Sequence, residues 1–129
     1  MLNKTLKDKI VILTGIGGGI GICAAERLMN NGAKLIGISS KEKKSLPSSI
    51  LTHKNLLDIF SCNFQFPKEV DKTCKIIKTK YNCPDIIINN AAKFDFKKLE
   101  DLSYNEIMSA FNVNIIAPIL ICKFFIKSF

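Results

Sequence analysis

The stretch from Gly15 to Gly21 contains five glycines in seven positions, between an apolar run and a segment with helical spacing. A strand that turns through glycines into a helix is a frequent phosphate-binding element. The helix N-terminus presents unpaired backbone N–H groups and the positive end of its dipole, and glycine lets a pyrophosphate approach without meeting a Cβ atom. These residues predict a nucleotide-binding turn. The alternative is a tight turn without a ligand.

The spacing of these glycines fits more than one pattern. From Thr14 the sequence reads TGIGGGIG, which matches both TGxxxGxG and TGxxGxxG. The GxGxxG pattern fails from Gly15 because Ile20 stands at its last position. A P-loop is excluded because no G-K-[ST] follows the turn. The residues alone leave the first two patterns open.

Ser39, Ser40 and Lys41 lie at the end of the second predicted strand and just after it. Dinucleotide-binding proteins with a parallel sheet that prefer NAD usually carry an acid at the end of the second strand, where it binds the ribose hydroxyls. A pair of hydroxyls with nearby lysines suits the 2′-phosphate of NADP instead, while the alternative is a solvated lysine loop without ligand contact. We therefore expect NADP(H) to be favoured over NAD(H).

Two stretches with asparagines are further candidates. The sequence NNAA, at 89–92, ends the fourth predicted strand, at the sheet edge where open parallel sheets bind ligands. Its alternative interpretation is a simple turn, since asparagine is common in turns. Asn114 lies in an otherwise apolar helical stretch. Because burying an unpaired amide costs roughly 1–3 kcal/mol, Asn114 should have partners unless it meets water.

Alternating strands and helices must position these residues. Strands are expected at 9–15, 33–39, 56–63 and 85–92, and helices at 22–32, at 67–81 and from Tyr104 onward, with a capping box of Ser103 and Glu106 and a bend at Pro118. This alternation predicts an α/β fold with a Rossmann-type, doubly wound parallel sheet in the order 3-2-1-4. We expect one incomplete domain over residues 1–129, with the fourth strand at an edge and the chain ending after the helix that follows it.

Composition restricts the partners and the compartment. The formal net charge is +8, and all of its cations except Arg27 are lysines, which favours a solvated surface over nucleic-acid binding. Five widely spaced cysteines without a CxxC pair fit neither a disulfide framework nor a zinc site, so we expect buried thiols in a reducing cytosol. The longest apolar run, 115–121, is too short to span a bilayer. We expect a soluble cytoplasmic protein that contacts neither membrane nor nucleic acid.

The sequences TGIGGGIG, NNAA and NVN, in this order and spacing, resemble the short-chain dehydrogenase/reductase family over about residues 7–129. They are similar to its cofactor turn, its NNAG motif and the stretch with its helix-borne active-site asparagine. NNAA together with NVN favours the TGxxxGxG branch, and the chain resembles 3-oxoacyl-carrier-protein reductases. The similarity covers about the first half of such a protein.

The resemblance implies roles for the matching residues. Gly15, Gly19 and Gly21 would face the pyrophosphate, Thr14 would brace the turn, and Ile20 would cover the cofactor. With the residues after the second strand, the candidate cofactor-binding residues are Thr14, Gly15, Gly19, Ile20, Gly21, Ser39, Ser40, Lys41, Asn63, Asn90 and Ala91. Of these, Asn90 and Ala91 would line the adenosine-ribose side, and Asn63 replaces an Asp that touches adenine. Asn114 would hold a water that positions the catalytic lysine, and no metal is expected.

The implied function is hydride transfer between NADP(H) and a carbonyl or alcohol substrate. The family also needs a Ser and a Tyr-x-x-x-Lys, whereas Tyr81 is followed by Asp85 and Tyr104 by Met108. The chain is therefore expected to be the cofactor-binding half of an oxidoreductase, forming a homo-oligomer through its last helix. The alternative is a non-catalytic NAD(P)-binding remnant of a truncated reductase, and a basic nucleic-acid binder is weaker still.

Overall fold

The centre of the fold is a four-stranded parallel sheet in the order β3-β2-β1-β4. The computed structural model describes residues 5–128. The strands are β1 (Ile10–Thr14), β2 (Lys34–Ser39), β3 (Leu56–Ser61) and β4 (Ile86–Ile88). This order confirms the predicted Rossmann-type sheet, including β4 at its edge. β3 and β4 end earlier than predicted, and the chain after β4 bonds to the Thr14 side chain instead of continuing the strand.

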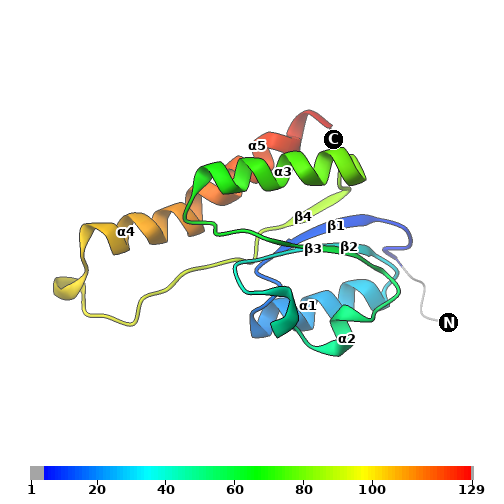
Figure 1. The fold of residues 1–129 in the computed structure, drawn as a ribbon, viewed down its shortest axis with the longest axis horizontal. Coiled ribbons are helices and arrows are strands. Elements are labelled where there is room, and N and C mark those ends of the chain that lie inside the picture. The colour runs from blue at the N-terminus through cyan, green and yellow to red at the C-terminus, as the bar shows by residue number, and fades with distance from the viewer. Residues whose placement is uncertain (1–4, 129) are drawn as a thin grey trace.

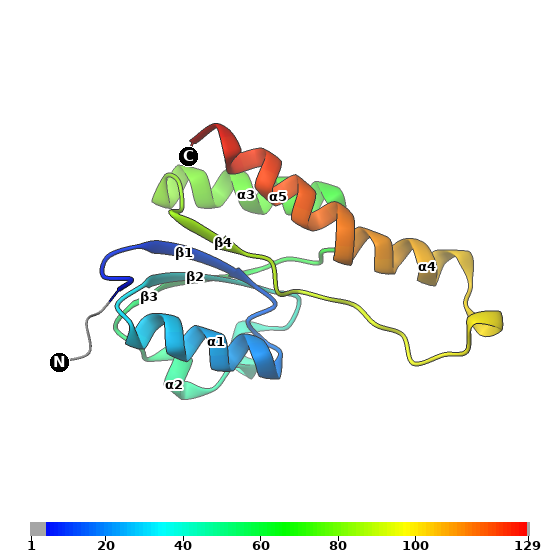
Figure 2. The same ribbon diagram turned by 180° about the vertical axis from the view of Figure 1, so that it is seen from behind.

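Helices cover both faces of the sheet. One face carries α1 (Gly19–Asn30) and α2 (Ser48–Leu51), and the other carries α3 (Pro67–Tyr81) and α5 (Ala117–Phe125), which lie side by side (Figure 1). α4 (Tyr104–Phe111) leads into α5 and projects beyond the sheet together with the loop before it (Figure 2). Short 3₁₀ turns are η1 (Lys43–Ser45), η2 (Leu99–Asp101) and η4 (Ile126–Ser128). α1 begins three residues earlier than predicted, inside the glycine stretch.

The core consists of two apolar layers separated by the sheet. Alternate side chains of β1 point to opposite faces, so Val11 and Leu13 pack toward α1 while Ile12 packs toward α3 and α5. All three side chains are fully buried. This double burial explains why the strand is a continuous β-branched and aliphatic run instead of an alternating one.

The long C-terminal helix contains a π-helical segment, η3 (Asn112–Ile116), between α4 and α5. The backbone N–H of Ala117 donates to the carbonyl of Asn112, five residues back. Pro118 has no N–H to offer the carbonyl four residues before it, so a regular α-helix is already interrupted here. The irregularity expected at Pro118 is thus a wide turn just before it, and this turn contains Asn114.

The helix from Tyr104 to Phe125 is long and apolar enough to cross a membrane by length and composition alone, and little of it is buried inside the described chain. The apolar run 115–121 therefore understated the length of apolar helix, because α4, the π-helical η3 and α5 form one continuous helical segment. Its exposed apolar side chains include Tyr104, Phe111 and Ile119. These side chains are exposed because little of the described chain lies against them.

The cysteines are only partly as expected. Cys62 and Cys74 are buried in the core, and burial raises the pKa of both thiols, that of Cys74 to about 12. Cys23, in contrast, lies on the exposed side of α1, and Cys83 and Cys122 are half-buried. The expectation of uniformly buried thiols was wrong for Cys23, because its position on α1 faces away from the sheet.

The predicted capping box at the start of α4 is present. The Ser103 hydroxyl oxygen accepts the backbone N–H of Glu106 at 3.3 Å, and the backbone N–H of Ser103 donates to Glu106 Oε2 at 2.9 Å. Lys97 forms an ion pair with the same carboxylate. Lys97 first, and then the N–H and hydroxyl of Ser103, hold the pKa of Glu106 at about 2. The N-terminus of α4 is therefore capped by side chains of its own sequence.

This capping box predicts an acid-sensitive helix. A carboxyl pKa lowered from 4.5 to about 2 adds stability that is present above 4.5 and is lost as the pH falls toward 2. Glu106→Gln should abolish this part of the pH dependence of the melting temperature, measured by circular dichroism. Glu100→Gln, at an exposed acid in η2, is the control and should keep it. Identical pH profiles for wild type and Glu106→Gln would contradict the assignment.

Candidate functional site

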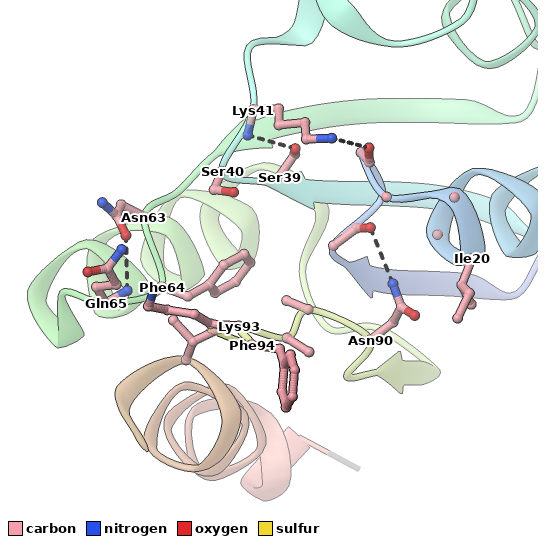
Figure 3. Close-up of a pocket in the computed structure, with 18 residues that line it drawn as sticks. Ile20, Ser39, Ser40, Lys41, Asn63, Phe64, Gln65, Asn90, Lys93 and Phe94 are labelled. Atoms are coloured by element: carbon pink, nitrogen blue, oxygen red, sulfur yellow. Dashed lines mark hydrogen bonds between the residues drawn. The ribbon is translucent and has the colours of Figure 1, made fainter. Parts of the chain in front are cut away.

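A pocket of about 610 Å³ opens where the carboxyl ends of the strands meet (Figure 3). This volume lies within the range of small-molecule sites. The chain leaves β1 toward β2 on one side and reaches β4 on the other, which is the switch point at which open α/β sheets bind ligands. The predicted site residues that line it are Gly15, Gly19, Ile20, Gly21, Ser39, Ser40, Lys41, Asn63, Asn90 and Ala91.

The glycines of the turn have different reasons to be glycine. Gly15 has φ +71°, and a Cβ atom there would lie 2.7 Å from the Ala91 Cα atom. A Cβ atom at Gly21 would lie 2.1 Å from the carbonyl oxygen of Gly15. Packing within the chain therefore requires these two glycines. At Gly19 a Cβ atom would meet nothing within 4 Å, so the missing side chain there only keeps the pocket open.

The N-terminus of α1 has no side-chain cap. Its N-cap residue is Gly18, and no acid lies in its first turn. The first helical bond in the turn is donated by the Ile22 N–H to the Gly18 carbonyl at 2.9 Å, so the N–H groups before it have no partner within the helix. α1 thus differs from the capped α4, and it presents donors and a positive dipole end to the pocket.

Thr14 joins the turn to the loop that follows β4. Its Oγ1 atom accepts the backbone N–H groups of Asn90 and Ala91, each at 3.0 Å, and its hydroxyl donates to the Ile88 carbonyl at 3.5 Å. The Asn90 amide donates in return to the carbonyls of Thr14 and Gly15 at 3.1 and 3.2 Å. Thr14 is buried beneath the pocket and not among its lining residues, which fits a bracing position.

The end of β2 and the segment after it close one end of the pocket. Ser39 is 2% exposed, and its Oγ atom accepts the backbone N–H of Lys41 at 2.9 Å. The Lys41 ammonium reaches across to the Gly17 carbonyl at 3.0 Å (Figure 3). Ser40 is exposed and lines the same end. The Lys41 ammonium therefore lies beside the glycine turn. None of the residues that line the pocket is acidic.

Asn63 lies at the end of the pocket formed by the turn between β3 and α3. Its Oδ1 atom accepts the backbone N–H of Gln65 at 3.1 Å, and its own backbone N–H donates to Glu69 at 2.9 Å. The side chain of Asn112 in η3 donates to the Gln65 carbonyl at 3.0 Å. These bonds hold the turn in place and leave the Asn63 amide at the pocket lining.

Asn114 has the partners expected of a polar residue in an apolar helix. Its Oδ1 atom accepts the Lys93 N–H at 2.7 Å, and its amide donates to the Lys93 carbonyl at 2.8 Å. Asn114 itself does not line the pocket, although its neighbour Val113 does. It acts on the site by fixing the backbone of the loop that enters the pocket after Ala92.

Several lining residues are not among the predicted ones: Gly17, Gly18, Phe64, Gln65, Ala92, Lys93, Phe94 and Val113. Gly17, Gly18 and Ala92 belong to the TGIGGGIG and NNAA motifs, so their position in a motif could have predicted that they line the pocket. Phe94 is 76% exposed and Ile20 is 78% exposed. An exposed aromatic residue in a polar loop was the signal for Phe94, because such a side chain gains stability only by covering something else.

The parallel sheet in this order, with a glycine turn leading into its first helix, defines a Rossmann-type dinucleotide-binding fold. A family model described as short chain dehydrogenase matches residues 9–129, and the chain therefore belongs to that family. An uncharacterised oxidoreductase of Staphylococcus aureus is 30% identical over 110 residues, covering 85% of this chain and 48% of that protein. The chain thus spans about half the length of the curated relatives that it matches.

Solved structures of dehydrogenases have a similar fold. A short-chain dehydrogenase of Burkholderia cenocepacia, in complex with NADP, matches with a TM-score of 0.84 and 25% identity over 95% of this chain and 51% of that chain. The aldohexose dehydrogenase of Thermoplasma acidophilum, in a ligand-free form, matches with a TM-score of 0.79 and 28% identity over 96% of this chain and 45% of that chain.

The Thr14 hydroxyl should be essential for the β4 loop. Thr14→Val keeps the shape of the side chain but leaves the N–H groups of Asn90 and Ala91 without their acceptor. The free energy of unfolding should fall by about 1–3 kcal/mol in urea denaturation. Thr14→Ser, which keeps the oxygen, should lose less than Thr14→Val. Equal stability of Thr14→Val and wild type would show that the loop is held by other contacts.

Proposed function

We propose that this chain is the cofactor-binding half of an NADP(H)-dependent oxidoreductase, forming one domain over residues 1–129. The whole enzyme would transfer hydride between NADP(H) and a carbonyl or alcohol substrate. The observation that carries the proposal is the uncapped N-terminus of α1, which opens beside Gly19 onto a pocket of about 610 Å³. An anionic ligand is the partner that this arrangement stabilises best.

The residues of the pocket fit a dinucleotide along its length. Gly15, Gly19 and the free N–H groups of the first turn of α1 would hold the pyrophosphate. Ile20, exposed at the mouth, would cover it. Asn90 and Ala91 would line the adenosine-ribose side, and Asn63 would contact adenine. Gly21 would contribute indirectly, because its contact with Gly15 lets α1 begin so close to the turn.

The preference for NADP(H) is supported by charge. Lys41 and Ser40 line the end of the pocket where an acid would bind ribose hydroxyls. Glu42, the nearest acid in sequence, pairs with Lys44 at 2.8 Å, which leaves the Lys41 ammonium for a ligand. The NADP complex of the Burkholderia relative supports the same cofactor. Ser39 would contribute by holding Lys41, since its oxygen already accepts the Lys41 N–H.

A bound nicotinamide cofactor supplies the hydride chemistry, and the chain supplies binding and orientation. Asn114 would act through the loop after β4, where its two bonds to Lys93 fix the backbone next to the substrate side of the pocket. In residues 1–129 no tyrosine is followed four residues later by lysine. The proton donor of the reaction would therefore come from outside these residues.

The apolar helix fits a protein interface better than a bilayer. Asn112 and Asn114 tie its middle to the loops of the sheet, which places η3 on the domain. We propose that the exposed face of α4 and α5 packs against protein, including a second copy in a homo-oligomer. A cytoplasmic location agrees with five cysteines that form no disulfide in the described residues and with a soluble dinucleotide as ligand.

The phosphate site predicts opposite effects of one substitution on folding and binding. Gly19→Asp places a carboxylate at the first turn of α1, where it should leave stability unchanged or raise it by roughly 0.3–1 kcal/mol. The same charge should weaken NADPH binding by about tenfold or more in fluorescence titration. Gly19→Asn, nearly equal in size but neutral, should lose less affinity. Unchanged NADPH affinity in Gly19→Asp would refute the nucleotide site.

The 2′-phosphate predicts a preference that depends on Lys41. Wild type should bind NADPH about tenfold more tightly than NADH, and Lys41→Ala should remove most of this difference because it deletes a charge-assisted bond. Lys43→Ala, which removes a neighbouring exposed charge outside the pocket, is the control and should retain the preference. A wild type that prefers NADH would reject the assignment to NADP(H).

A further inference from the structure

Gly17 lies where the glycine turn meets the segment after β2. A Cβ atom at this residue would lie 2.8 Å from the Ser39 Oγ atom and 3.2 Å from the Lys41 Cδ atom. The first distance is closer than carbon and oxygen atoms approach without a shift. Ser39 is buried and its oxygen is bonded to the Lys41 N–H, so it has little freedom to give way. The space above Gly17 is therefore occupied by Ser39 and Lys41.

The neighbouring glycines do not share this environment. At Gly18 the nearest atom to a Cβ would be the Gly15 carbonyl oxygen at 3.6 Å, an ordinary contact, and at Gly19 there would be none within 4 Å. Gly17 has no positive φ that would require glycine for the backbone. Of these three consecutive glycines, only Gly17 is required by contact with the side chains of Ser39 and Lys41.

Lys41 is held at both ends. Its backbone N–H donates to Ser39 Oγ at 2.9 Å, and its ammonium donates to the Gly17 carbonyl at 3.0 Å (Figure 3). An ammonium has three donors, so the bond to Gly17 leaves two for a ligand. A long flexible side chain that is already fixed in this way loses less entropy when it binds an anion.

We propose that Gly17 is a positioning residue that sets the preference for a phosphorylated ribose by leaving room for the Lys41 side chain to cross the turn. This inference rests on the proposed function, because it assumes that a dinucleotide lies in the pocket with its 2′-phosphate near Lys41. Gly17 does not bind the phosphate itself. It acts through Lys41, with Ser39 as the second support.

The test compares NADPH and NADH affinities of the full chain by fluorescence titration. Gly17→Ala should weaken NADPH binding by about tenfold, as expected for loss of one charge-assisted bond, and should change NADH binding little. Lys41→Ala should have a similar effect, and the double variant should lose no more than either single variant, because both remove the same interaction. Additive losses would overturn the inference.

Gly18→Ala is the matched control. It adds the same methyl group one residue later, out of reach of Ser39 and Lys41, so any loss of affinity should be equal for NADPH and NADH. An equal loss for both cofactors in Gly17→Ala would mean that Gly17 is only part of the turn, and would overturn the inference. If wild type binds neither cofactor, the proposed function fails. This result is distinct from failure of the inference on Gly17, in which wild type binds NADPH and Gly17→Ala loses both cofactors equally.

Ser39→Ala provides a second route if Gly17→Ala does not fold. It removes the acceptor of the Lys41 N–H without adding volume to the turn. The preference for NADPH over NADH should again fall, and the circular dichroism spectrum shows that the variant is folded. An unchanged preference in folded Ser39→Ala would reject the positioning of Lys41 through this segment.

Discussion

The close approach of Gly21 to the carbonyl oxygen of Gly15 is the contact on which the rest of the site depends. Because neither residue has a side chain, α1 can begin five residues after β1 ends and can still pack on the sheet beside it. The helix N-terminus is then brought to the edge where all four strands end. A longer connection would move its N–H groups and its dipole away from that edge. The location of the pocket follows from this geometry.

Polar side chains then fix the loops around the pocket by bonding to backbone. Thr14 and Asn90 lock the loop after β4 to the glycine turn, and Asn114 holds the same loop from the helix on the other side. Asn112 and Asn63 do the same for the turn after β3. Each of these side chains satisfies backbone groups that a sharp turn leaves without partners. The pocket is therefore shaped before a ligand arrives, which reduces the entropy lost on binding.

Two helices of this chain, α1 and α4, differ at their N-termini. At α4 the Ser103 side chain accepts the Glu106 N–H, the Glu106 side chain accepts the Ser103 N–H, and the Glu106 carboxylate places a negative charge in the first turn. α1 begins with glycines and provides none of these. Since a capped terminus would be the more stable choice for an isolated helix, the bare end of α1 agrees with a ligand that completes it.

The local pattern of residues was enough to predict the strands, the helices, the glycine turn and the capping box, because each of these depends on neighbours within a few positions. The same pattern located most of the pocket lining, since the ends of parallel strands meet at one edge by topology. It did not separate Gly17, which packs against Ser39 and Lys41, and Gly21, which packs against Gly15, from Gly19, which faces open space. It also did not reveal that Lys41 crosses to Gly17, or that Asn114 bonds to Lys93. Those contacts join segments about twenty residues apart or more, and only the packed sheet and helices bring them within hydrogen-bonding distance.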